Sequence, residues 1–325
     1  MTTVPDKSKG SPFRAPESIC DAMDDVPETT SSSARSATLP PEEVAELRRI
    51  AVDLAETAAA HVRTRRPEVF GPAGAQADDA VQAKGHPTDP VTVVDTETED
   101  LIRTLLAEQR PGDPILGEEG GGALAAADDV VTWVVDPIDG TVNFLYGLPG
   151  YAVSVAAMRG GRSIAGAVVD VARAATYSAG VGLGAMRVDG DGVVEHLRCN
   201  PVDTLSMSLV ATGFAYGAHR RARQAQLVAQ LLPRVRDIRR LGAAALDLCH
   251  VAAGQVDAYY EHGLNAWDFA AGALIASEAG ALLALPPATV PGSAGDLVVA
   301  AAPGIAEELG KLLTDIGATD SLPDQ

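Results

Sequence analysis

Apolar and polar positions along the chain first follow a helical period. Apolar side chains recur every three or four residues between Val44 and Val62, directly after two prolines and two glutamates. This spacing predicts an amphipathic helix of about five turns, with the acidic pair at the positive end of its dipole. A second helix is predicted over residues 96–108, with a Pro-Gly pair close behind to stop it.

Short continuous apolar runs then predict strands. They cover residues 130–135, 153–158 and 163–169. The Arg-Gly-Gly-Arg sequence at 159–162 joins the last two runs as a hairpin, and residues 176–178 are predicted to extend the same sheet.

Beyond residue 200, strand and helix patterns alternate. The predicted elements are a strand near Leu209, helices over 223–232 and 243–253, a strand over 256–260, a helix over 266–279, a strand over 297–301 and a helix over 305–313. The pattern as a whole predicts a mixed α/β (α+β) protein, in which a largely antiparallel sheet precedes alternating elements.

The same pattern divides the chain into four segments. Residues 1–40 are rich in Ser, Thr, Pro and Asp and have no apolar period, so a disordered N-terminal tail is expected. An N-terminal α+β half is expected over 41–200, with most of the candidate metal ligands. A C-terminal alternating α/β half is expected over 201–318, and a short tail over 319–325.

The charge balance limits how this protein can handle an anion. The chain has 44 acidic and 25 basic residues, a formal net charge of −19, and only four of the basic residues are lysines. A protein this acidic repels phosphate at long range, so a phosphate site in it favours bound cations over a lysine cradle. Acidity that serves only solubility is the plainer alternative.

No segment of the sequence indicates a membrane or an exported location. No apolar run approaches the roughly 20 residues that span a bilayer. The N-terminus lacks the apolar stretch of a signal peptide, and three scattered cysteines do not make a disulfide framework or a Cys-based zinc site. We therefore expect a cytoplasmic protein with no membrane partner.

The most informative segment is Trp-Val-Val-Asp-Pro-Ile-Asp-Gly-Thr at 133–141, where an apolar strand ends in two carboxylates. Proline restricts the turn, so that Asp136 and Asp139 converge and a cation must relieve their repulsion. Oxygen-only ligands favour Mg²⁺ or another hard divalent ion. Gly140 and Thr141 would open a helix whose free N–H groups hold a phosphate. An ordinary Asp-Pro turn that caps a helix is the alternative explanation.

Three further acidic residues stand at the end of an apolar run or the start of a helix. Glu118 lies in Gly-Glu-Glu-Gly after a short apolar run, Asp268 lies in Trp-Asp-Phe-Ala-Ala-Gly, and Asp95 follows Pro-Val-Thr-Val-Val. Each also has a plainer explanation, which is a solvated acidic loop for Glu118 and a helix cap for Asp95 and Asp268.

Together these segments resemble the inositol monophosphatase family of metal-dependent phosphatases, most of all its actinobacterial members. The resemblance runs from about residue 42 to 315. Its motifs, in order, are Lys84 with Asp-Pro-Val-Thr-Val-Val-Asp at 89–95, Gly-Glu-Glu at 117–119, Asp-Pro-Ile-Asp-Gly-Thr at 136–141 and Trp-Asp-x-Ala-Ala-Gly at 267–272, with further matches at 240–245 and 259–261. It implies a layered αβαβα sandwich of the metal-dependent, lithium-sensitive sugar phosphatase type, and a homodimer.

The resemblance also implies a ligand set for two or three Mg²⁺ ions. Glu118, Asp136 and the carbonyl of Ile138 would hold one ion. Asp136, Asp139 and Asp268 would hold a second, and Glu118 would help to place a third. Lys84 would lie in a loop near this site.

The implied reaction is the hydrolysis of inositol monophosphate to inositol and phosphate. Asp95 and Thr141 would orient and deprotonate the attacking water, with Glu118 assisting. The amides of Gly140 and Thr141 would bind the phosphate. Ala244, Glu261 and Asp139 would meet the substrate hydroxyls. The expected substrate is thus a small phosphorylated polyol.

One position departs from the family pattern, and it bears on the substrate. Many relatives carry Ser or Thr where this chain has Ala243, so a hydroxyl near the substrate is absent. Histidinol phosphate, fructose 1,6-bisphosphate and adenosine bisphosphate remain alternative substrates. Glu261 favours a polyol or an amine over a second phosphate, because a carboxylate repels the added charge.

A different class of function stays open because of a basic cluster. The chain places seven arginines, at 220, 221, 223, 234, 236, 239 and 240, within 21 residues. Such a cluster suits RNA or a partner in the transcription machinery, such as RNA polymerase. A solvated helix face or a subunit interface is the simpler explanation, since no aromatic residues are interleaved for base stacking.

Overall fold

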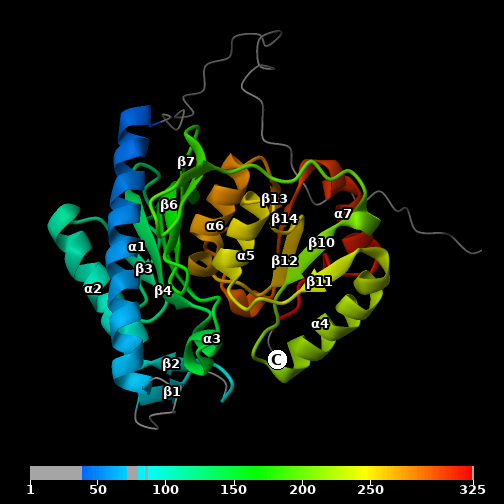
Figure 1. The fold of residues 1–325 in the computed structure, drawn as a ribbon, viewed down its shortest axis with the longest axis horizontal. Coiled ribbons are helices and arrows are strands. Elements are labelled where there is room, and N and C mark those ends of the chain that lie inside the picture. Colours follow the sequence, from blue (N-terminus) through cyan, green and yellow to red (C-terminus); the bar gives the residue numbers. More distant parts are fainter. Residues whose placement is uncertain (1–38, 72–79, 85–86, 324–325) are drawn as a thin grey trace, which may run out of the picture.

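The computed structural model describes residues 39–71, 80–84 and 87–323. Most of the expected N-terminal tail, residues 1–38, lies outside these ranges. The described chain forms five layers in the order helix, sheet, helix, sheet, helix (Figure 1). This arrangement confirms the αβαβα sandwich expected from the sequence.

The first layer consists of α1 (Pro41–Phe70) and α2 (Val93–Gln109). At 30 residues, α1 extends two turns beyond the predicted helix. Its last turns lack the apolar period, but Phe70 is buried and Arg65 forms an ion pair with Glu97 of α2 at 2.7 Å. Contacts to α2 therefore hold the end of α1 where the local pattern does not.

The first sheet has seven strands in sequence order, and α1 packs against its middle. The strands are β3 (Ile115–Gly117), β4 (Val131–Asp139), β5 (Ala152–Arg159), β6 (Arg162–Asp170), β7 (Ala175–Gly180), β8 (Gly184–Val188) and β9 (Val194–His196). Only β3 and β4 pair in parallel; the other neighbours are antiparallel. The predicted hairpin at 159–162 is confirmed.

The central layer consists of α5 (Ala244–Ala252) and α6 (Ala266–Glu278), which lie between the two sheets (Figure 1). A helix covered on both sides must be apolar around most of its circumference, and both helices are rich in alanine. Small side chains also bring the helices close together. A Cβ at Gly272 of α6 would lie 2.8 Å from the Cβ of Leu248 of α5.

The second sheet has five strands in the order β11-β10-β12-β14-β13. They are β10 (Leu209–Thr212), β11 (Asp237–Arg239), β12 (Ala258–His262), β13 (Leu282–Ala284) and β14 (Leu297–Ala301), and α4 (Ala218–Leu231) and α7 (Pro303–Asp315) form the outer layer. Leu322, in the segment assigned to a C-terminal tail, is buried in the core beneath α7.

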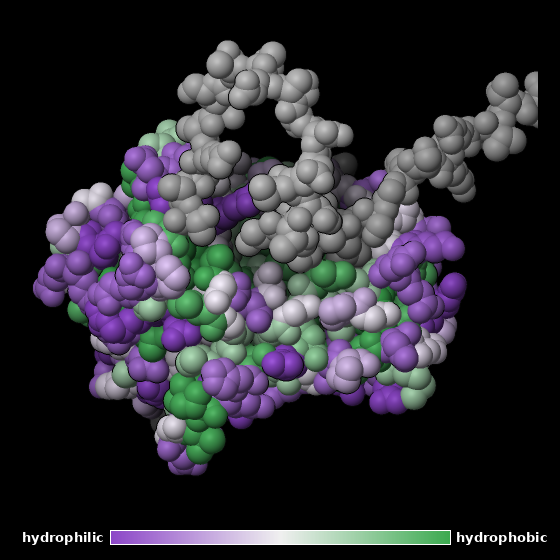
Figure 2. Space-filling view, turned by 90° about the horizontal axis from the view of Figure 1, so that it is seen from above, coloured by the Kyte–Doolittle hydropathy of each residue, from purple (hydrophilic) through white to green (hydrophobic). Residues whose placement is uncertain are grey.

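The remaining short elements are β1 (Val81–Ala83), β2 (Pro90–Thr92), α3 (Thr141–Tyr146) and three 3₁₀ helices, at Leu205–Met207, Leu232–Arg234 and Gly292–Ala294. Seen from above, hydrophilic side chains gather at both ends of the layered molecule, where the outer helices lie (Figure 2). Within the described ranges, none of the helices has the length and apolar character needed to cross a bilayer.

Candidate active site

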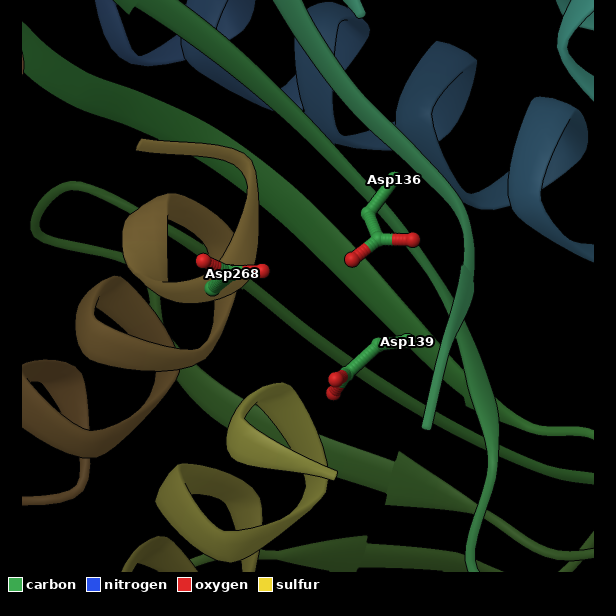
Figure 3. A group of neighbouring side chains, drawn as sticks. All are labelled: Asp136, Asp139 and Asp268. Atoms are coloured by element: carbon green, nitrogen blue, oxygen red, sulfur yellow. The ribbon is translucent and has the colours of Figure 1, made fainter. Parts of the chain in front are cut away.

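Three carboxylates from two different layers converge at one point. Asp136 and Asp139 come from β4, and Asp268 comes from the first turn of α6. One oxygen of each lies within 4.8 Å of the others, and the side chains point toward one another (Figure 3). The local pattern predicted this convergence for the β4 pair, and the family resemblance predicted that Asp268, 129 positions beyond Asp139, would join it.

An irregularity in β4 turns its two carboxylates to the same side. The predicted strand continues through Asp139, but its pairing with β5 shifts register between Asp136 and Asp139. Pro137 has no N–H to offer the ladder, and the N–H of Ile138 donates to Asp136 Oδ1 at 3.0 Å. This local bond fixes the Asp136 carboxylate.

Asp139 is held by the first turn of α5. Its Oδ1 accepts from the N–H of Ala244 at 3.2 Å, and its Oδ2 accepts from the N–H of Ala245 at 2.7 Å. The N-cap residue of α5 is Ala243, which has no hydroxyl to cap the helix. The carboxylate of Asp139 therefore takes the place of a capping side chain, 105 positions away from the helix that it caps.

Asp268 is held in a similar way, although it is not itself the N-cap. Asn265 occupies that position in α6, and its N–H donates to Asp268 Oδ2 at 2.6 Å. The N-cap of α6 is therefore Asn265, three residues before the Asp268 that the capping explanation named. This bond fixes Asp268 Oδ2, while the side chain lines the same cavity as Asp139.

The electrostatics of the cluster favour a bound cation. Desolvation raises the pKa of Asp139 to about 8, and desolvation with the neighbouring carboxylates raises the pKa of Asp136 and of Asp268 well above the ordinary value. A divalent cation relieves this repulsion. The donors are all oxygens, which suits a hard ion such as Mg²⁺. The chemistry of the donor set thus fits the implied metal.

Glu118 faces the same cluster from the turn after β3, and its charge contributes to the raised pKa of Asp136. The Nζ of Lys84 lies 2.6 Å from Glu118 Oε1 and 2.8 Å from Glu119 Oε1. Burial acts to lower the pKa of Lys84, but the two glutamates outweigh it and raise the pKa. Lys84 is therefore a cation at the edge of the cluster.

A further glutamate, Glu99, shapes the turn that carries Glu118. It is 1% exposed, and its two oxygens accept from the N–H groups of Glu119 and Gly120 at 2.8 Å each. Arg103 balances its charge at 2.7 Å. The sequence pattern did not single out Glu99, because nothing in an isolated helix shows that a carboxylate points into the sheet.

Asp95 and Thr141 form a second, fully enclosed pair beside the carboxylate cluster. Thr141 Oγ1 lies 3.3 Å from Asp95 Oδ1 and 3.0 Å from the carbonyl of Ile138. Thr92, the N-cap of α2, donates its N–H and its hydroxyl to the other oxygen of Asp95. Asp95 is therefore the third residue of a capping box, not the cap suggested by the sequence. Burial raises its pKa to about 7.

The backbone after β4 is open toward the cavity because of Gly140. Its φ of 86° lies in the left-handed region, and a Cβ would come within 2.9 Å of the carbonyl of Gly150 and 3.0 Å of that of Gly242. Only glycine fits this position. It is the N-cap of α3, so the amides of Gly140 and Thr141 lie at the start of a short helix.

A cavity of about 230 Å³ opens next to the cluster. Its walls include Glu118, Asp139, Gly140, Ala244, Glu261 and Asp268 from the expected site, and also Tyr216, Arg220 and Arg240, which the sequence did not assign to it. Six of the eleven expected site residues thus line the cavity. The other five do not line it, but close contacts link them, directly or through one another, to the acidic residues of the site: Lys84, Asp95, Asp136, Ile138 and Thr141.

Glu261 lies on the wall of this cavity at the end of β12. The hydroxyl of Tyr259 donates to Glu261 Oε2 at 2.5 Å. Desolvation raises the pKa of Glu261 to about 7, while Arg240 and Arg220 act in the opposite direction. Near neutral pH, Glu261 is therefore present both in its ionised form, which accepts hydrogen bonds, and in its protonated form, which can also donate one.

Comparison with known proteins agrees with this geometry. The model of the inositol monophosphatase family matches residues 43–318. An inositol-1-monophosphatase of Mycobacterium leprae is 61% identical over 276 residues, which cover 84% of this chain and 94% of that protein. The solved structure of Mycobacterium tuberculosis SuhB has a TM-score of 0.71 and 54% identity, covering 85% of this chain and 98% of that one.

A more distant relative carries a different name. The Nus factor SuhB of Escherichia coli is 41% identical over 208 residues, which cover 63% of this chain and 75% of that protein. The family match spans most of the chain, and the two mycobacterial proteins are covered almost completely. The chain belongs to the inositol monophosphatase family, a family of metal-dependent enzymes that hydrolyse phosphomonoesters.

Proposed function

We propose that this chain is a Mg²⁺-dependent phosphatase that hydrolyses inositol monophosphate to inositol and phosphate. The observation that carries the proposal is the convergence of Asp136, Asp139 and Asp268 beside a cavity that Asp139 and Asp268 line. The Asp95–Thr141 pair is joined to this cluster through the carbonyl of Ile138. Phosphoryl transfer depends mainly on positioning and charge neutralisation, and this site offers groups for both.

The ligand set that we propose follows the donors at the cluster. Glu118, Asp136 and the Ile138 carbonyl would hold one Mg²⁺, and Asp136 would share a second with Asp139 and Asp268. Glu118 would help to place a third. Bound Mg²⁺ supplies Lewis acidity and makes water a stronger acid. The same ions reverse the sign of the local field, which lets a phosphate approach a protein of net charge −19.

The chain's own side chains would orient and deprotonate the nucleophile. Thr141 Oγ1 lies between Asp95 Oδ1 and the Ile138 carbonyl, so its hydroxyl can accept from a water while it donates to either. Asp95, with a pKa near 7, is a suitable acceptor for the proton at neutral pH. The amides of Gly140 and Thr141 would bind the phosphate oxygens.

The remaining walls of the cavity would recognise the alcohol. Asp139 and Glu261 would offer carboxylate oxygens to it, and Ala244 would contact it as part of the cavity wall, since the N–H of Ala244 already donates to Asp139. Glu261 would accept from ring hydroxyls, which favours inositol. Arg220 and Arg240 line the same cavity, so an anionic substrate also finds opposite charge there. Fructose 1,6-bisphosphate, histidinol phosphate and adenosine bisphosphate are therefore the alternative substrates to test.

A phosphate-release assay tests this proposal. The panel contains inositol 1-phosphate, the three alternative substrates and a simple sugar phosphate, each with Mg²⁺ and with a chelator. We expect inositol 1-phosphate to have the highest kcat/KM and the chelator to abolish release. Asp136→Asn is expected to be inactive but folded, and Asp113→Asn, a carboxylate outside the cluster, is the matched control. Preference for fructose 1,6-bisphosphate, or full activity of Asp136→Asn, would contradict the proposal.

A regulatory role in transcription is a second candidate, motivated by the E. coli relative's name and by the arginine cluster. The structure weakens it, because Arg220 is 3% exposed and donates to the carbonyl of Ser293 instead of facing solvent. Arg239 forms an ion pair with Asp237 at 2.6 Å. RNA retention that falls steeply with salt would support this role, and no retention at low salt would end it.

Assembly and location complete the proposal. We infer a homodimer from the family resemblance. Tyr146, the last residue of α3, and Leu148 are 70% and 53% exposed, and exposed apolar side chains of this kind are available for a contact between two copies. Light scattering is expected to give twice the chain mass. We also propose a cytoplasmic enzyme whose activity lithium lowers, which a lithium titration of phosphate release would measure.

A further inference from the structure

A second cavity lies outside the candidate active site. It has a volume of about 260 Å³ and is bordered by β7, β8, the turn between β6 and β7, and the region at the end of α5. Its lining residues are Arg173, Ala175, Tyr177, Arg187, Asp189, His250 and Gln255. It shares no lining residue with the first cavity.

Buried polar atoms without hydrogen bonds gather at this second cavity. Arg187 Nε and His250 Nδ1 both lack a hydrogen-bond partner within the described ranges. The nearest acidic group to the His250 nitrogen is Asp247, whose Oδ1 faces His250 Nδ1 from 3.9 Å, beyond hydrogen-bond distance, and which does not line the cavity. Buried polar groups in folded proteins are nearly always satisfied, so a concentration of exceptions indicates a missing partner. The cavity is many times larger than the roughly 15 Å³ that a single water needs.

The chemistry of the lining indicates an anion as that partner. Two of the seven lining residues are arginines and a third is His250. Burial raises the pKa of Tyr177 to about 12, so its hydroxyl stays a donor at any physiological pH. The one lining carboxylate, Asp189, already accepts from the N–H groups of Asp191 and Val193 at 3.0 and 2.9 Å. The charge of Asp189 is therefore partly balanced by hydrogen bonds from the backbone of its own turn.

Acidic groups outside the lining leave the arginine donors partly available. Glu195 Oε2 lies 3.4 Å from Arg187 Nη2, and the side chain of Glu195 is 54% exposed. That pair leaves Arg187 Nε unused. Arg173 Nη1 lies 2.8 Å from Asp170 Oδ2, and 60% of the Arg173 side chain is exposed. A guanidinium has five N–H donors, so each arginine retains donors for a ligand.

We propose that this cavity is a binding site for a small oxyanion, with Arg187 and His250 as its principal contacts and Arg173 at its mouth. Forked N–H donors match the oxygens of phosphate or carboxylate. The turn at the mouth supports this assignment. Ala174, next to Arg173, has a φ of 50° and is the one non-glycine residue of the described ranges in the left-handed region. Such conformations persist where the surrounding structure enforces them.

Calorimetric titration with inorganic phosphate tests the proposal on the full chain. With a chelator present, the carboxylates of the active site repel phosphate, and we expect one phosphate per chain from the second cavity alone. With Mg²⁺ present, we expect two. The chelated result does not depend on the proposed function: failure of the Mg²⁺-dependent site would remove only the second phosphate.

Two substitutions assign the bound phosphate to this cavity. Arg187→Gln and His250→Gln are each expected to weaken phosphate binding by about tenfold or more in the chelated protein, since each removes a charged or buried donor. Arg162→Gln is the matched control, because Arg162 is exposed at the start of β6 and does not line the cavity. Its affinity is expected to equal that of the wild type.

Folding of each variant is checked by its thermal transition without phosphate, and either variant alone suffices if the other does not fold. A chelated wild type that binds no phosphate would overturn the proposal. Equal weakening by Arg162→Gln would also overturn it, because binding would then reflect general charge.

Discussion

Thr141 Oγ1 lies 3.3 Å from Asp95 Oδ1, although 46 positions separate the two residues. Asp95 is in the first turn of α2, and Thr141 begins α3 directly after β4. The two helix starts meet beside the carboxylate cluster, so one side chain from each can act on the same water molecule. Because the other oxygen of Asp95 is held by Thr92, only Oδ1 is left for this contact.

Asp95→Asn is expected to lower kcat by about 10² to 10⁴ while the fold is retained. Asparagine keeps the shape of the side chain and can still accept from Thr92, but it cannot take a proton. Asp100→Asn is the control, since Asp100 is exposed on the same helix. Steady-state kinetics with Mg²⁺ give the result. If Asp95→Asn kept the wild-type kcat, Asp95 would have no role in the proposed reaction.

A second prediction concerns Gly213 and Glu261, which both line the cavity. A Cβ at Gly213 would lie 1.8 Å from Glu261 Oε2. Gly213→Ala must therefore displace a carboxylate that Tyr259 holds at 2.5 Å. We expect KM for inositol 1-phosphate to rise by about tenfold, with a smaller change in kcat, because Glu261 would bind the alcohol and not the reacting phosphate.

Gly190→Ala is the matched control for this substitution, since the nearest atoms to its Cβ lie at 3.6 Å. Its kinetic constants should equal those of the wild type. If Gly213→Ala changed kcat and left KM alone, Glu261 would have no part in holding the alcohol.

The comparison of sequence and structure shows which features a local pattern can predict. The period of α1 and the apolar runs on either side of the Arg-Gly-Gly-Arg turn of the β5–β6 hairpin identified these elements, because both are local signals. Several short strands were missed: β1, β2, β8, β9, β11 and β13. Strands β11 and β13 show why, because each has three residues that are not fully buried and exists through pairing with a longer neighbour elsewhere in the sequence.

The site shows the same limit. The carboxylates of Asp136 and Asp139 could be singled out, because a strand that ends in Asp-Pro-Ile-Asp is unusual. The hydrogen bonds that orient Asp139 come from α5, more than 100 positions away, and no local signal indicates them. Arg220 was expected on a solvated face or at a subunit interface, but tertiary packing buries it beside the cavity.

Ala243 provides a prediction about stability. It is the N-cap of α5 and is 2% exposed, and no side chain at that position caps the helix. Ala243→Ser adds a hydroxyl that can accept from the N–H of Leu246 at the third helical position, because the N–H of Ala245 at the second already donates to Asp139. We expect the free energy of unfolding to rise by about 0.5–2 kcal/mol. Denaturant titration measures it, and Ala253→Ser at the other end of α5 is the control.

A destabilised Ala243→Ser protein would contradict this prediction. It would mean that the bonds from Ala244 and Ala245 to Asp139 already saturate the helix start, and that the added hydroxyl is buried without an acceptor or donor to meet it.

The raised pKa values at the site predict how stability depends on pH and on metal. Asp95 and Asp139 have folded-state pKa values of about 7 and about 8, above the ordinary 3.8 that applies to the unfolded chain. The folded, metal-free protein therefore binds protons more tightly than the unfolded chain does. The contribution of these two groups to the stability of the metal-free protein should be greatest below about pH 4 and should fall as pH rises toward 8.

In the proposed function Mg²⁺ would bind the ionised carboxylates, so it would compete with the protons that stabilise the metal-free fold. The rise in melting temperature on adding Mg²⁺ should accordingly be larger at pH 8 than at pH 6. Asp136→Asn removes one of the mutually repelling charges. That variant should lose less stability between pH 6 and pH 8 without metal, and should gain less from Mg²⁺. Thermal melts with Mg²⁺ and with a chelator at both pH values measure these effects. An equal Mg²⁺ effect at the two pH values would mean that these carboxylates are not the groups that bind the ion.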